Sequence, residues 1–143
     1  MTAVSAIWAK AHGATTHFPI ALALCSFALD AAGRACARKP IERDLHLAAC
    51  WTMICGGLGT VPAVMSGILM TQGIVMGHDA LRLHHVFVWP AFGLLVGLGT
   101  WRFLQRNRSP GHGFSACYLV LASFAAALLS IAAYWGGKMM VSR

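Results

Sequence analysis

The chain has 143 residues, of which 58% are hydrophobic and only 10% are charged. Soluble proteins carry about 25% charged residues, and a soluble domain of this size has too little interior for so many apolar side chains. This composition excludes a soluble fold. Four membrane-spanning helices of about 20 residues each would use most of the apolar residues that the chain contains.

Asp, Glu, Lys and Arg are absent from four long windows, which are residues 11–29, 47–77, 83–101 and 109–137. Uncharged runs of this length are typical of transmembrane helices. The windows predict four spans, near residues 13–33, 47–72, 82–104 and 113–136. Because the connections are short and no linker occurs, we expect a single transmembrane domain over residues 1–143, folded as an all-α, antiparallel four-helix bundle.

The basic residues predict how this bundle is oriented. Seven of the eleven Lys and Arg residues lie between the first and second spans or between the third and fourth. By the positive-inside rule these two connections are cytoplasmic, so both termini are expected to be periplasmic in a bacterial inner membrane. The net charge of +7 suits anionic lipid at the inner leaflet. Nucleic-acid binding is not needed to explain it.

Small residues in two spans predict close helix contacts. Gly56, Gly57 and Gly59 lie in the second span, and Gly93 and Gly97 lie in the third. The five cysteines form no CxxC or CxxCH motif and lie in spans or in a cytoplasmic connection, so we expect no disulfides.

The seven histidines are the most informative residues, because they gather at the ends of the spans. His17 lies near the start of the first span, and His84 and His85 begin the third. His17 precedes Arg34 by 17 residues, as His85 precedes Arg102. At 1.5 Å per residue both imidazoles lie about 25 Å from the inner boundary. Ionisable groups at this depth are costly unless they face the bundle interior, which makes them functional candidates.

Two neutral imidazoles at one level of a bundle can ligate a haem iron from opposite sides. We expect haem b held by His17 and His85. His84 is the substitute, because successive residues point about 100° apart and cannot both face one iron. Trp135 is among the aromatic residues expected to line the ring. The alternative is that each histidine is an interfacial polar residue.

His46 and His112 open the second and fourth spans at the inner face and could hold a second haem. Hydration beside the polar connections is the favoured explanation for this pair. His12 and His78 are expected to be solvated outside the membrane.

Asp30 lies in the last turn of the first span, and Arg34 follows four residues later. This spacing favours an interfacial ion pair over a proton relay. Soft side chains at the predicted outer face make a copper site a minor alternative. They are Met70, Met76, His78, Met139 and Met140.

Two motifs resemble those of a known family. The run THFPIAL, residues 16–22, is similar to the HFPIAL opening motif of a widespread bacterial four-helix membrane family classified as a domain of unknown function. The run WGGKM, residues 135–139, is similar to that family's terminal GG motif. His17, Asp30, Gly136 and Gly137 fall on matching positions. Members of the family are sometimes fused to c-type cytochrome or Rieske modules, which implies a redox setting.

Together these features predict an integral membrane b-type cytochrome, or the membrane anchor subunit of a larger complex. It would pass electrons between a periplasmic redox partner and the quinone pool or another membrane complex. We expect an electron-transfer subunit rather than a complete enzyme. The alternatives are a cofactor-free accessory subunit that stabilises a membrane complex, and a copper or small-solute transporter.

Overall fold

A computed structural model of the chain describes residues 3–106 and 116–141. They form four helices: α1 (Ala3–Ala35), α2 (Glu42–Met70), α3 (Asp79–Gln105) and α4 (Ala116–Val141). Each helix is long enough and apolar enough to cross a membrane. The predicted all-α fold with four spans is therefore confirmed. The side of the membrane on which the termini lie stays a prediction.

Two helices begin five or more residues before their predicted spans. α1 starts at Ala3 rather than near residue 13, and α2 starts at Glu42 rather than at residue 47. The first turn of α2 carries Glu42 and Asp44, whose negative charges suit the positive end of the helix dipole. The uncharged windows therefore locate the part of each helix suited to lipid, whereas the helical hydrogen bonds continue into the charged flanks.

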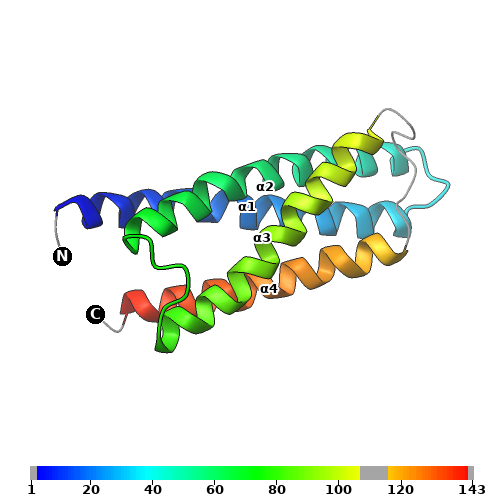
Figure 1. Cartoon of the computed structure of the whole chain (residues 1–143). Coiled ribbons are helices and arrows are strands. Elements are labelled where there is room, and N and C mark those ends of the chain that lie inside the picture. The colour runs from blue at the N-terminus through cyan, green and yellow to red at the C-terminus, as the bar shows by residue number, and fades with distance from the viewer. Residues whose placement is uncertain (1–2, 107–115, 142–143) are drawn as a thin grey trace.

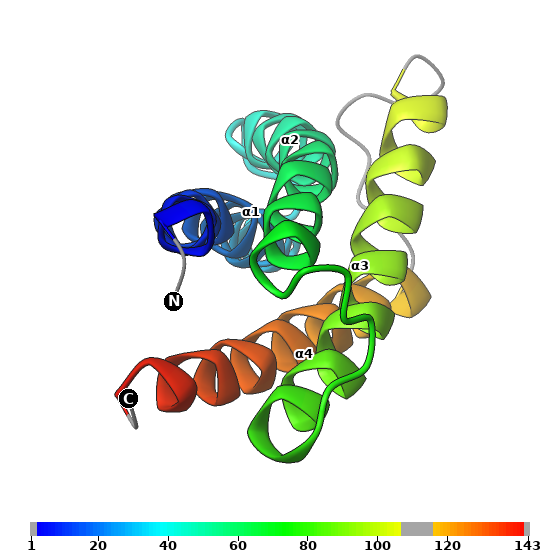
Figure 2. The same cartoon turned by 60° about the vertical axis from the view of Figure 1, so that its left-hand side comes forward.

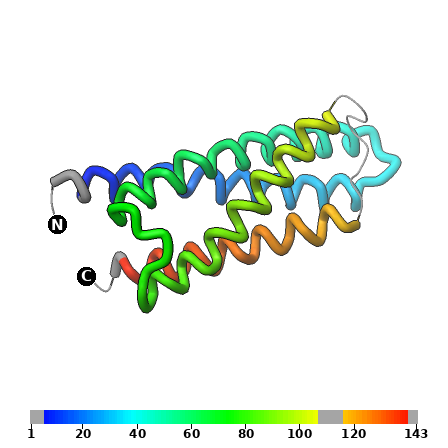
Figure 3. Tube along the Cα trace, in the orientation of Figure 1, coloured from blue at the N-terminus to red at the C-terminus, as the bar shows by residue number. Residues whose placement is uncertain are grey.

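The helices pair as two antiparallel hairpins. α1 and α2 run side by side along their length, and α3 crosses obliquely from α4 toward α2 (Figures 1 and 3). α1 also contacts α4, and the view in Figure 2 separates the α1–α2 hairpin from the α3–α4 hairpin. We call the end that holds the starts of α1 and α3 the outer end, and the opposite end the inner end, after the predicted orientation.

Small side chains bring the helices together in the centre of the bundle. The buried apolar cluster includes residues from all four helices, which are Ala23, Met53, Leu95, Leu98, Tyr118, Ala122 and Ala125. The alanines keep the helix backbones close, as expected for helix packing in a membrane.

The glycines predicted to lie at a helix contact in the second span do so. A Cβ added at Gly57 would lie 2.8 Å from the Leu95 carbonyl oxygen of α3, and one at Gly56 would lie 3.3 Å from the Leu22 Cβ of α1. Gly93 and Gly97 differ, since no described atom lies within 4 Å of a Cβ added at either position. The glycines of α2 therefore form the predicted close helix contact, and Gly93 and Gly97 of α3 do not take part in it.

The connection between α2 and α3 folds back against the outer end of α3. It begins with Gln72 and Gly73 in the left-handed region, with φ of 55° and 87°. The Trp89 indole N–H donates to the Val75 carbonyl at 3.0 Å, and the Gly77 N–H donates to His85 Nδ1 at 3.3 Å. These contacts fix the connection beside the two histidines that begin α3.

Replacing Gly57 with Ala tests the α2–α3 contact. The new methyl group would lie 2.8 Å from a backbone oxygen, which cannot rotate away, so the helices must separate. We expect a loss of about 1–3 kcal/mol in the free energy of unfolding, as for other overpacked contacts. Thermal unfolding in detergent micelles, followed by circular dichroism, measures it. Gly97→Ala is the matched control, and an equal midpoint for the two variants would contradict the packing described.

Candidate functional site

Three ionisable side chains from three helices meet inside the inner half of the bundle. They are Asp30 of α1, His46 of α2 and Arg102 of α3, and each exposes 2% of its surface or less. We call them the inner cluster. Burial of this kind inside an apolar bundle is costly unless the charges are paired, so their bonding decides whether the arrangement is stable.

The Asp30 carboxylate accepts hydrogen bonds from both of its neighbours. His46 Nδ1 donates to Oδ1 at 2.9 Å, and the Arg102 guanidinium donates to Oδ2. The negative charge of Asp30 is thereby matched by the positive charge of Arg102, while the imidazole uses the second carboxylate oxygen. One carboxylate thus joins α1, α2 and α3.

The surrounding residues shape the cluster. The His46 ring lies directly against Gly33, where an added Cβ would be 2.7 Å from Cε1, so only glycine leaves room for the imidazole. The Arg102 guanidinium carbon lies 4.3 Å from the centroid of the Tyr118 ring, a cation–π contact that brings in α4. One turn before Asp30, the Ser26 hydroxyl donates to the Ala49 carbonyl at 2.8 Å. All four helices therefore contribute to the inner cluster or to its packing.

This bonding corrects two sequence expectations. Asp30 was expected to pair with Arg34 at the interface, but it bonds across the bundle to His46 and Arg102. His46 was expected to be hydrated, but it is 2% exposed and held by Asp30. Spacing along α1 alone favours Arg34 as the partner of Asp30. The folded bundle instead brings His46 and Arg102, from two other helices, into hydrogen-bond distance of the carboxylate.

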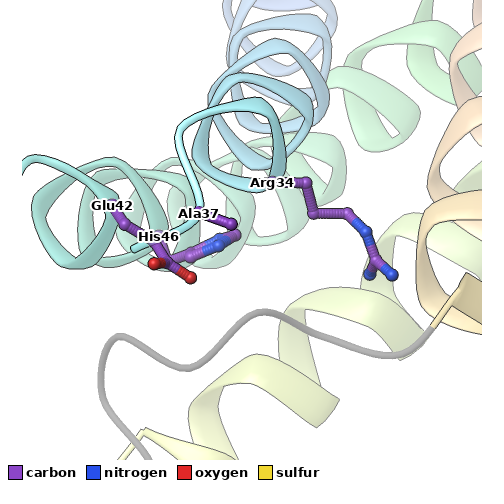
Figure 4. A pocket seen from close by; sticks show the side chains of 4 residues that line it. All are labelled: Arg34, Ala37, Glu42 and His46. Carbon is purple, nitrogen blue, oxygen red and sulfur yellow. The ribbon is translucent and has the colours of Figure 1, made fainter. Parts of the chain in front are cut away.

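An open pocket of about 380 Å³ adjoins the inner cluster. Arg34, Ala37, Glu42 and His46 line it, and Figure 4 shows Arg34 extending away from the other three. The Glu42 carboxylate accepts a hydrogen bond from the Arg38 backbone N–H at 2.6 Å, which secures the end of the α1–α2 connection. The pocket thus lies where the inner cluster meets the inner surface.

The histidines predicted to hold haem lie near the outer end in different surroundings. His17 is exposed on α1, whereas His85 is buried and accepts the Gly77 N–H at Nδ1. His84 is partly buried, and its Nδ1 donates to the Ala132 carbonyl of α4 at 2.8 Å. Trp135 is partly buried on α4, with Lys138 Nζ 5.0 Å from its ring centroid. The axial pair of His17 and His85 stays a prediction.

His12 is not the solvated residue that the sequence indicated. It is partly buried, and its Nδ1 donates to the Ala63 carbonyl of α2 at 2.9 Å. His78 is exposed, as expected. The residue that the sequence placed outside the membrane is thus packed against α2.

Only one histidine of the predicted second haem pair lies within the described residues. His46 belongs to the inner cluster, and His112 lies outside the described residues. Within residues 3–106 and 116–141, no three His, Cys, Asp or Glu side chains are placed to hold a metal ion together.

The comparisons with known proteins identify the family. The family described as Predicted membrane protein (DUF2231) matches residues 10–143. The chain belongs to this family. The HFPIAL-like motif and the GG motif both indicated this family. The four helices agree with its description as a membrane protein. No curated protein and no solved structure matches the chain.

Sequence reasoning missed the pairing of Arg102 and the burial of His12. Arg102 follows directly on an uncharged window at the depth where Asp30 closes another, and this shared depth was the signal for a cross-bundle pair. For His12 the signal was weaker. That signal is a small residue on the neighbouring helix that is followed one turn later by glycine, as Ala63 is followed by Gly67.

Replacing Asp30 with Ala tests the inner cluster. The substitution leaves the Arg102 charge buried without its carboxylate, so we expect a loss of about 3–5 kcal/mol in the free energy of unfolding. The double variant D30L/R102M removes both charges and keeps apolar volume, and should lose less than D30A. Chemical unfolding in mixed micelles measures both. A D30A variant as stable as wild type, or a double variant less stable than D30A, would contradict this role.

Proposed function

We propose that this membrane protein is a b-type cytochrome, an electron-transfer subunit whose outer-end histidines hold haem b. It would carry electrons between a periplasmic redox partner and the quinone pool or a larger membrane complex. The observation that carries the proposal is that each hairpin holds an imidazole near the outer end by a hydrogen bond to its partner helix, His12 to the Ala63 carbonyl and His84 to the Ala132 carbonyl.

The donor set suits haem better than it suits a bare metal ion. Structural zinc takes four protein ligands, and catalytic zinc takes three. The described residues offer no group of three His, Cys, Asp or Glu donors. Haem supplies four nitrogen ligands of its own, so a pair of imidazoles is sufficient to complete six-coordinate iron. When bound, haem supplies the one-electron chemistry of its iron.

The chain's contribution is to hold and insulate this group. The apolar helices provide a low-dielectric setting, which tunes a redox centre. Trp89 and Trp135 are partly buried near the outer end and provide aromatic surface. The inner cluster joins α1, α2 and α3 at the opposite end, and so sets how the two hairpins meet.

The alternatives make different demands on the same residues. A cofactor-free accessory subunit needs the histidines only as helix-to-helix hydrogen-bond donors. A copper transporter needs the methionines and histidines of the outer end to exchange ligands with the periplasm. Both alternatives are separated from the cytochrome by whether the purified protein contains haem.

The test is a reduced-minus-oxidised absorption spectrum of the protein, purified in mild detergent from cells supplied with haem precursor. We expect the α-band of haem b, with about one haem per chain by pyridine haemochrome assay. A folded preparation without the band overturns the proposal. Stoichiometric copper without iron, by elemental analysis, would instead support the transporter.

A further inference from the structure

The pocket at the inner end lies at the level of the lipid headgroups. α1 ends at Ala35 and α2 begins at Glu42, and these bounds are also the ends of the first two candidate membrane spans. Arg34 and Glu42, two of the lining residues, therefore lie where the apolar helices meet the polar surface of a bilayer. A phospholipid headgroup is the chemical group that a membrane presents at this depth.

His46 brings an unpartnered acceptor to this pocket. The Asp30 carboxylate is paired with the Arg102 guanidinium and only accepts, so the hydrogen between Asp30 and His46 lies on His46 Nδ1. In the neutral ring, Nε2 then has the free electron pair. This Nε2 is buried and has no hydrogen-bond partner among the described residues. A buried acceptor without a donor is costly, so a donor supplied from the pocket would stabilise it.

Glu42 adds a second acceptor on the same face of α2. It precedes His46 by four residues, and side chains at this spacing are neighbours on a helix. Its Oε2 accepts the Arg38 backbone N–H at 2.6 Å, which holds the carboxylate in place. Within the part of the chain that the structure describes, Glu42 forms no ion pair. The pocket therefore contains a carboxylate and a nitrogen lone pair that both call for a hydrogen-bond donor.

Arg34 supplies the opposite charge on the other side of the pocket. Figure 4 shows its side chain extended away from Glu42 and His46. Arginine is well suited to phosphate oxygens, because its N–H groups match their geometry. The pocket is thus complementary to a zwitterion in which a phosphate and an ammonium are separated by a short link.

We propose that this pocket binds the headgroup of phosphatidylethanolamine, a phospholipid that joins a phosphate to a primary ammonium. The ammonium has three N–H donors, as the lysine side chain has. These would bond to the Glu42 carboxylate and to His46 Nε2, while the phosphate would contact Arg34. The site does not depend on haem, so its test is separate from that of the proposed function.

Other phospholipid headgroups match fewer of these groups. The trimethylammonium of phosphatidylcholine has the same charge but no N–H, so it donates to neither acceptor. Phosphatidylglycerol has hydroxyl donors, but its net negative charge is repelled by the carboxylate of Glu42. The combination of a carboxylate, a nitrogen lone pair and a guanidinium therefore favours the primary ammonium.

The test is a lipid titration of the purified protein, followed by native mass spectrometry, which counts the lipids bound to each chain. Phosphatidylethanolamine, phosphatidylcholine and phosphatidylglycerol with identical acyl chains are compared. Losing one charge-assisted hydrogen bond costs about tenfold in affinity or more, so we expect phosphatidylethanolamine to bind at least about tenfold more tightly than phosphatidylcholine. Equal affinities for these two lipids would overturn the proposal, as would tighter binding of phosphatidylglycerol.

Glu42→Gln removes the charged acceptor. The amide oxygen can still accept the Arg38 N–H, so the variant should fold, and we expect its affinity for phosphatidylethanolamine to fall about tenfold. Asp44→Asn is the matched control, because it removes the same charge from the same turn of α2 at an exposed residue outside the pocket. Unchanged affinity in Glu42→Gln, or an equal loss in Asp44→Asn, would overturn the proposal.

His46→Asn removes the second acceptor. The asparagine amide nitrogen takes the place of Nδ1 and can still donate to Asp30, but no group replaces Nε2. We expect the preference for phosphatidylethanolamine over phosphatidylcholine to fall, and a preference kept in the folded variant would overturn the role of Nε2. Circular dichroism establishes folding. If His46→Asn does not fold, the comparison of Glu42→Gln with Asp44→Asn decides the question.

Soluble phosphoethanolamine distinguishes the lipid from its free headgroup. It also joins a phosphate to a primary ammonium, but it has no acyl chains to pack on the apolar helices. We expect that an equal concentration of phosphoethanolamine leaves the lipid bound. Displacement of the lipid under these conditions would show that the pocket takes the free headgroup, and would overturn the assignment to a membrane lipid.

Discussion

The Asp30 carboxylate is the interaction on which the arrangement of the bundle depends. It is buried and binds a base from each of two other helices, the imidazole of His46 and the guanidinium of Arg102. In an apolar interior an unpaired charge is strongly destabilising, so Asp30 and Arg102 each need the other in place. The inner ends of α1, α2 and α3 are therefore held in one register, and Tyr118 extends this contact to α4 through its ring.

A fixed inner end has consequences for the outer end. The outer-end histidine contacts stay within hairpins, with His12 on α2 and His84 on α4. The hairpins are thus joined by ionic hydrogen bonds at one end of the bundle, and each holds one imidazole by a hydrogen bond at the other. Glycines lie beside both rings, where a Cβ added at Gly67 would be 3.0 Å from His12 Cε1 and one at Gly136 would be 3.3 Å from His84 Nδ1, so any larger residue would crowd the imidazole.

Much of the fold could be predicted from the sequence, because lipid imposes a simple rule on charge. The four uncharged windows located the spans, and the glycines of the second span correctly indicated a close contact. The cross-bundle partners were harder to predict, since Asp30 and Arg102 lie 72 residues apart and spacing along one helix favoured Arg34 instead. His12 was missed because it precedes the predicted first span by one residue, although the helix itself begins at Ala3. Tautomers depend on a neighbour's carbonyl or N–H group, and no sequence pattern distinguished His84 from His85 in this respect.

The central claim is that the outer end holds iron between two imidazoles from different hairpins. Electron paramagnetic resonance of the oxidised wild-type protein in lipid nanodiscs tests this most directly, because the signal of ferric haem reports its axial ligands. The account predicts a low-spin signal of the bis-imidazole type. A high-spin signal, or no haem signal from folded protein, would contradict it.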